Sequence, residues 1–133
     1  MTVQSKTNQV LKGALALSAT DPQAGVIQLE DELKLARARG DMASIHKLAR
    51  NAAIICSSGL GEFRRALAYL EEALRSQPDD ASLYALSSDL HRVLGDSDKA
   101  EASLSRSVVL AREQGDLEMA SALNAKLASL KTS

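Results

Sequence analysis

Apolar residues recur every three or four positions over most of the chain, with polar residues between them. This spacing places the apolar side chains on one face of an α-helix. No segment alternates apolar and polar residues with the period of two that a half-buried β-strand shows. The pattern therefore predicts an all-α protein.

Turn-forming residues interrupt the helical pattern at regular intervals. Three of the breaks are Gly-Asp pairs, at Gly40-Asp41, Gly95-Asp96 and Gly115-Asp116. In each pair the glycine can end a helix in the left-handed conformation, and the aspartate can cap the next helix. The other breaks lie at 21–22, 59–61 and 78–80. We expect about seven antiparallel helices, spanning roughly 5–19, 22–39, 41–58, 62–76, 80–94, 97–114 and 116–131.

A second regularity has a longer period. Ala66 and Leu70 recur 34 residues later as Ala100 and Leu104. An earlier copy of the same pair, Gly25 and Leu29, lies 75 residues before Ala100 and Leu104. A simple bundle has no reason to keep such a register, whereas a stacked array of helical hairpins does. The spacing therefore indicates a repeat protein.

These positions resemble the tetratricopeptide repeat family, whose signature includes a small residue, a bulky residue four positions later and a closing proline. Ala66, Leu70 and Pro78 match that signature. The resemblance implies a right-handed superhelical solenoid formed by one domain over residues 1–133. Its repeats are expected at about 6–39, 47–80 and 81–114, with a capping helix at about 116–131.

The chain departs from the family pattern in several places. The family tryptophan is absent, and Arg37 and Arg112 stand where a proline is expected. Gly13 falls at the position of the first-helix glycine in the first copy. Ile54 occupies the corresponding small-residue position in the second copy, which leaves the register of that helix open by one residue.

The composition argues against some kinds of partner and indicates the cellular compartment. The formal net charge of -1 provides no broad positive field for nucleic acid. No stretch approaches the roughly 20 uninterrupted apolar residues that a membrane span needs. The single cysteine, Cys56, cannot form an internal disulfide. We therefore expect a cytoplasmic protein that binds neither nucleic acid nor membranes.

The residues that could support catalysis are few. His46 and Cys56 are the candidates for a thiol-imidazole pair, but they lie on one predicted helix at a separation of roughly 15 Å along its axis. Two isolated histidines without ligating cysteines or paired carboxylates do not make a zinc site. The acidic runs at 30–32 and 71–72 are interpreted as solvated faces whose charges pair along their own helices. We expect no enzyme activity, cofactor or metal.

The family resemblance implies that the first helices of the hairpins line a concave groove for a peptide or partner helix. A register without gaps predicts that this groove is lined by Leu48, Asn51, Ile55, Ser58, Ala85, Asp89, Arg92, Leu123 and Lys126. Asn51 and Arg92 are expected to hydrogen-bond the partner, and Ile55 to provide an apolar contact. Ile55 also replaces the second asparagine of the family's carboxylate clamp, which disfavours binding of chaperone C-terminal tails.

Two functions fit these features. The first is a non-catalytic interaction module or adaptor that binds a protein or peptide partner. The alternative is a structural self-assembly unit that oligomerises through the ends of the solenoid. An apolar stripe in the last predicted helix could close the core or dock a second subunit, so a monomer or a weak homodimer is expected. The stripe consists of Met119, Ala120, Leu123, Leu127 and Leu130.

Overall fold

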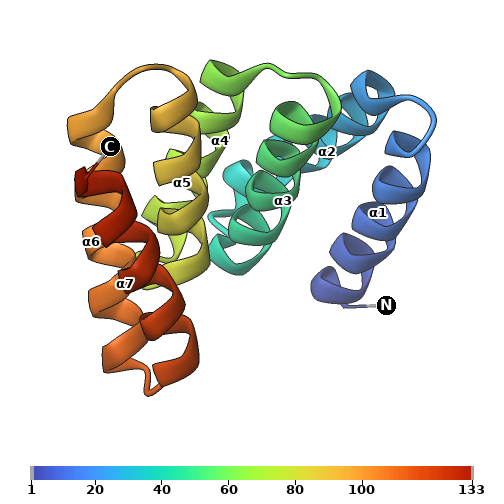
Figure 1. The fold of residues 1–133 in the computed structure, drawn as a ribbon. Helices are drawn as coiled ribbons and strands as arrows, with labels where there is room; N and C mark the ends of the chain where they lie inside the picture. The colour runs from blue at the N-terminus through green and yellow to red at the C-terminus, as the bar shows by residue number, and fades with distance from the viewer. Residues whose placement is uncertain (1, 133) are drawn as a thin grey trace. The chain divides into compact units, whose positions relative to one another are not determined.

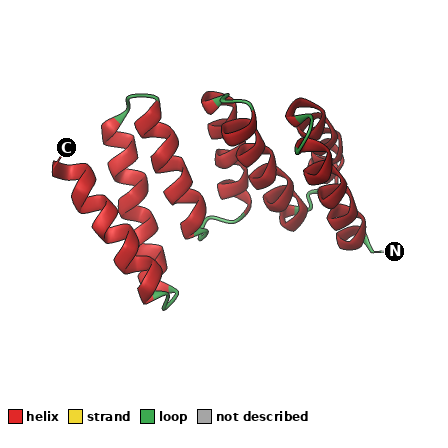
Figure 2. Cartoon of the chain, turned by 45° about the vertical axis from the view of Figure 1, so that its right-hand side comes forward, coloured by secondary structure: helices red, strands yellow, loops and turns green. Residues whose placement is uncertain are grey.

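The computed structural model describes residues 2–132, and every regular element in that part of the chain is helical (Figure 2). The helices are α1 (Val3–Ser18), α2 (Pro22–Arg39), α3 (Met42–Ile54), α4 (Phe63–Ser76), α5 (Ala81–Val93), α6 (Ser97–Glu113) and α7 (Leu117–Thr132). A short π-helix, η1 (Ile55–Gly59), continues α3. The predicted all-α fold with seven helices is confirmed. Among the described residues, no helix is both long enough and apolar enough to cross a bilayer.

The helices pack in sequential pairs (Figure 1). The chain divides into two compact units, residues 1–78 and 79–133. In the first unit α1 packs on α2 and α3 packs on α4, while α3 also contacts α2. In the second unit α6 packs against both α5 and α7. Each unit is therefore built from helical hairpins.

The three Gly-Asp turns adopt the geometry that their residue types predict. The glycines are left-handed, with φ of 65° at Gly40, 82° at Gly95 and 77° at Gly115. Asp41 then caps α3, because its carboxylate accepts the backbone N–H of Ser44 at 3.2 Å and the Ser44 hydroxyl at 2.7 Å. These hydrogen bonds lower the pKa of Asp41, the hydroxyl contributing most. The same two-residue pattern thus ends one helix and starts the next.

The small residues at the aligned repeat positions are buried between paired helices. Ala66 and Ala100 have no exposed surface. At the equivalent Gly25, an added Cβ would lie 2.7 Å from the Ser18 Cβ and 2.9 Å from the Ala14 carbonyl oxygen. Because both distances are too short for real atoms, only glycine fits between α1 and α2 at this point. The repeat alignment therefore corresponds to a shared packing contact.

In α1, the contact residue lies one position away from the expected one. Gly13 is exposed, and an added Cβ there would meet only Gln28 at 3.8 Å. Ala14 is fully buried instead. Ser88 of α5 is the small residue of the third copy: it is buried, and its hydroxyl donates to the Ala100 carbonyl at 2.7 Å.

An ionic network joins α2 to α4 in the first unit. Arg37 donates to both carboxylate oxygens of Glu72, at 2.6 and 2.7 Å, and to Glu30 at 3.0 Å. The Tyr69 hydroxyl donates to the other oxygen of Glu30 at 3.0 Å. The acidic runs are thus not merely solvated faces, because Glu72 pairs with a helix other than its own. Burial and the Glu30 carboxylate together raise the pKa of Tyr69 to about 12.

The apolar stripe of α7 closes the core of the second unit. Ala120, Leu123 and Leu127 are buried in one cluster with Leu104 of α6, among other residues. Met119 and Leu130 are partly buried against the same cluster. The stripe thus closes the core of its own unit, and docking of a second subunit through it stays a prediction.

Candidate functional site

The π-helical segment changes which residues of α3 face outward. The Leu60 N–H bonds the Ile55 carbonyl at 3.2 Å, five residues back, where an α-helix would bond four residues back. The Glu62 N–H then bonds the Cys56 carbonyl at 2.8 Å. The η1 segment therefore contains one residue more than a regular α-helical turn. The sequence alignment without gaps does not include this extra residue, so its assignments on α3 are displaced by one position.

Two of the expected groove residues, one on α3 and one at the start of η1, belong to the core. Leu48 has no exposed surface, and Ile55 is 5% exposed. The small buried residue of this helix is Ala53, one position before Ile54, and it too has no exposed surface. The one-residue displacement caused by η1 explains both observations. Leu48 and Ile55 therefore present almost no surface to a partner in this structure.

The polar residues expected on the same helix use their donors locally. The Asn51 side-chain amide donates to the Lys47 carbonyl at 2.8 Å. The Ser58 hydroxyl donates to the Ile54 carbonyl at 2.7 Å. Asn51 is half-buried, and this hydrogen bond uses one of the two N–H donors of its side-chain amide.

Catalytic and metal chemistry find little support in the described residues. Cys56 is fully buried, and burial raises the pKa of its thiol. A thiol of this kind carries little thiolate at neutral pH and is a poor nucleophile. Among residues 2–132, no group of three or more histidine, cysteine or acidic side chains is arranged to hold a metal ion.

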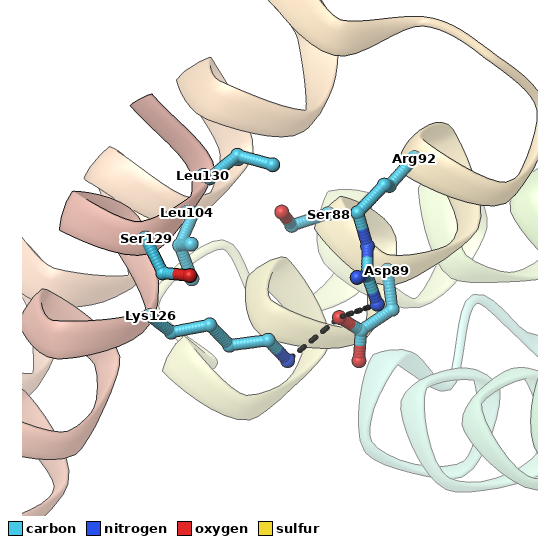
Figure 3. Close-up of a pocket in the computed structure, with 7 residues that line it drawn as sticks. All are labelled: Ser88, Asp89, Arg92, Leu104, Lys126, Ser129 and Leu130. Carbon is cyan, nitrogen blue, oxygen red and sulfur yellow. Dashed lines mark ion pairs between the residues drawn. The ribbon is translucent and has the colours of Figure 1, made fainter. Parts of the chain in front are cut away.

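The second unit contains a pocket of about 150 Å³ into which three of the expected site residues project. Asp89 and Arg92 come from α5, and Lys126 comes from α7 (Figure 3). The Lys126 Nζ lies 2.6 Å from Asp89 Oδ1, and the Arg92 Nη2 lies 3.7 Å from the same oxygen. The carboxylate of Asp89 thus stands between two cations from different helices.

The remainder of the pocket combines an apolar wall with hydroxyl groups. Leu104 of α6, which is 1% exposed, and the half-buried Leu130 of α7 form the apolar part. Ser88 and Ser129 also line the pocket. Since the Ser88 hydroxyl already donates to a backbone carbonyl, it presents lone pairs to the cavity.

Sequence reasoning did not assign these four residues to the site. Leu130 belongs to the apolar stripe of the last helix, but that pattern does not show that α5 and α7 line the same cavity. Of the two other expected residues of this unit, Leu123 lies in the core, where it is 9% exposed, and Ala85 is partly buried against it.

Comparisons with known proteins indicate the fold. No model of a protein family matches the sequence, and no curated protein matches it either. Among solved structures, the chain is similar to SycD, a type III secretion translocator chaperone of Yersinia enterocolitica, with a TM-score of 0.76 and 12% identity. That match covers 99% of this chain and 88% of SycD.

A second solved structure is that of PcrH in complex with the chaperone binding region of PopD. Its TM-score to this chain is 0.61 at 22% identity, and the match covers 94% of this chain and 93% of PcrH. Neither description is that of an enzyme. These likenesses, together with the helical pairing, confirm the tetratricopeptide-like fold.

Proposed function

We propose that this protein is a non-catalytic binding module that holds a segment of a partner protein at the pocket on α5, α6 and α7. The observation that carries the proposal is the meeting of Asp89, Arg92 and Lys126 beside the apolar wall of Leu104 and Leu130. Charged groups around an apolar recess can fix the orientation of a peptide while the recess holds one of its side chains.

The size of the pocket favours a peptide over a cofactor. Its volume of about 150 Å³ is below the range of roughly 300–1,000 Å³ that encloses small-molecule ligands. A space of this size suits one aliphatic or aromatic side chain, with the rest of the partner lying across the rim. Such a partner needs further contacts outside the pocket to bind firmly.

The fold comparisons support this class of function. PcrH, which shares the fold, is described in complex with the chaperone binding region of another protein. SycD is described as a translocator chaperone. A related role for this chain would be to hold a segment of a client protein.

A selection experiment tests the proposal. Peptides selected from a displayed random library on the purified chain of residues 1–133 are expected to bind the pocket. Ser129→Trp, which fills the pocket from its exposed rim, should weaken the selected peptides, whereas Ser121→Trp, on an exposed position of α7 outside the pocket, should not. Circular dichroism would verify that both variants fold. Failure to select any peptide, or equal binding to the two variants, would contradict the proposal.

A second function, self-assembly, is favoured by one observation in the first unit. Val3, Leu15 and Leu17 of α1 are 48%, 41% and 40% exposed. Val3 and Leu17 face nearly the same side of α1, whereas Leu15 lies about 160° from Leu17 around the helix, so Val3 and Leu17 are the pair suited to contact with another copy of the chain. Sedimentation equilibrium of the intact chain and of Leu17→Glu would test it: a dimer that dissociates in the variant would support self-assembly, and a monomer throughout would exclude it.

A further inference from the structure

We propose that the pocket selects partner segments in which an apolar side chain is followed closely by a carboxylate, and that Arg92 and Lys126 determine this preference. The inference rests on the proposed function, because it concerns the same pocket. It names the chemistry of the partner, which the fold comparison leaves open.

The charges around the pocket favour an acidic partner. Two cations and one anion line it, so its rim carries an excess of one positive charge. Both cations remain accessible, with 59% of the Arg92 side chain and 44% of the Lys126 side chain exposed. A carboxylate brought to the rim would meet both of them, whereas a basic side chain would be repelled.

Arg92 retains hydrogen-bonding capacity that the fold does not use. Within the described residues, its guanidinium makes an ion pair with Asp89 at 3.7 Å and no hydrogen bond. A guanidinium has five N–H donors in a planar fork that matches the two oxygens of a carboxylate. Lys126, by contrast, already lies 2.6 Å from Asp89. Arg92 is therefore the better placed to grip a partner.

Asp89 partly neutralises both cations in the unbound chain. Its Oδ1, the oxygen that faces Lys126 and Arg92, is buried. Within the described residues it makes ion pairs with both cations but no hydrogen bond of good geometry. An incoming carboxylate would share the cations with Asp89 and be repelled by its charge. Removal of that charge should consequently strengthen the binding of acidic segments.

The apolar half of the preference follows from the adjacent wall. Leu104 and Leu130 lie across the cavity from Arg92 (Figure 3). A partner whose apolar side chain enters the cavity would therefore present its neighbouring residue to the guanidinium. A single apolar residue without a carboxylate, or a carboxylate without an apolar neighbour, would satisfy only one side of the pocket.

The experiment uses the selected peptides that Ser129→Trp displaces. These peptides should be enriched in Asp or Glu within two positions of an aliphatic or aromatic residue. Arg92→Ala should weaken an acidic peptide by about 10-fold, as expected for a lost hydrogen bond to a charged group. The same substitution should leave the matched Glu→Gln peptide nearly unaffected. Arg106→Ala, an exposed arginine of α6 outside the pocket, is the matched control and should change neither affinity.

Asp89→Asn supplies a gain-of-binding test. It should tighten the acidic peptide by about 2- to 5-fold, the range for an exposed charge interaction, and raised salt should reduce that gain. Pocket-directed peptides without acidic residues, or equal effects of Arg92→Ala on the Glu and Gln peptides, would overturn this inference and leave the proposed function standing. Loss of every pocket-directed peptide would overturn both.

Discussion

The guanidinium of Arg37 on α2 and the carboxylate of Glu72 on α4 are joined by two parallel hydrogen bonds. Arg37 stands at a position where the tetratricopeptide signature has a proline. The arginine allows α2 to continue to Arg39 and links the second helices of the first two hairpins. Hydrogen bonding to Glu72 makes the largest contribution to raising the pKa of Arg37, so the guanidinium remains charged at any relevant pH.

The Arg37–Glu72 link should contribute measurably to stability. A double-mutant cycle with Arg37→Ala and Glu72→Gln is expected to give a coupling energy of about 0.5–1 kcal/mol. The bidentate geometry favours the upper part of this range, while the 38% exposure of the Arg37 side chain limits it. Arg65 and Glu62, an exposed pair three residues apart, form the control and should couple by about 0.5 kcal/mol or less. Equal coupling in the two cycles, measured by urea unfolding, would contradict the structural importance of the link.

Two glycines of the first hairpin should respond oppositely to alanine. Gly25→Ala places a Cβ 2.7 Å from Ser18 and should destabilise the protein by about 1–3 kcal/mol through overpacking. Gly13→Ala meets no close neighbour in an exposed helical position and should stabilise it by about 0.5–1 kcal/mol. Thermal unfolding of both variants checks the prediction. A gain in stability at Gly25 would show that α1 and α2 are farther apart than described.

Tyr69 should titrate well above an ordinary tyrosine. The chain has two tyrosines, so Tyr84→Phe leaves Tyr69 as the sole phenol. Its pKa, followed by phenolate absorbance, is expected at about 12. Glu30→Gln should lower this pKa but leave it above 10.0, because burial is the larger cause. Since the folded pKa is raised, the associated stability is fully present below pH 10 and is lost as the pH rises through about 12.

The Asp41 cap should make stability depend on acid pH. The pKa of Asp41 is lowered from its ordinary 3.8, so its stabilising effect is present above that value and is lost as the pH falls through the lower, folded pKa. The melting-temperature difference between wild type and Asp41→Asn should therefore shrink as the pH falls from neutral toward about 2. Asp31→Asn, at an exposed position of α2, controls for the general loss of a negative charge. A difference that stays constant with pH would argue against the ionised cap.

The fold could be predicted because its determinants are local. A Gly-Asp pair such as Gly40-Asp41 ends one helix and caps the next through contacts within a few residues. The small residues Ala66 and Ala100 are likewise recognisable from their spacing. The π-helical turn at η1 could not be predicted in this way, because it depends on packing. An added Cβ at Gly59 would lie 3.0 Å from Pro22 of α2, so the segment is held by close contact with another helix.

The candidate site was predictable only where the helical register was regular. Asp89 and Arg92 lie three residues apart on α5 without any irregularity, and both reach the pocket. Leu48 and Ile55 were displaced into the core by the extra residue of η1. The pairing of Asp89 with Lys126 brings together residues that are far apart in sequence, and no local pattern encodes the distance between them.

The number of residues in η1 determines which side chains of α3 face outward. Deleting one residue from 57–58 would convert the segment to a regular α-helix and turn the preceding part of α3 by about 100° relative to the residues that follow. Lys47 and Ile54 would then take the places of Leu48 and Ile55, which are now in the core. The loss or gain of one residue at this point would therefore change which side chains of α3 face a partner without any other substitution.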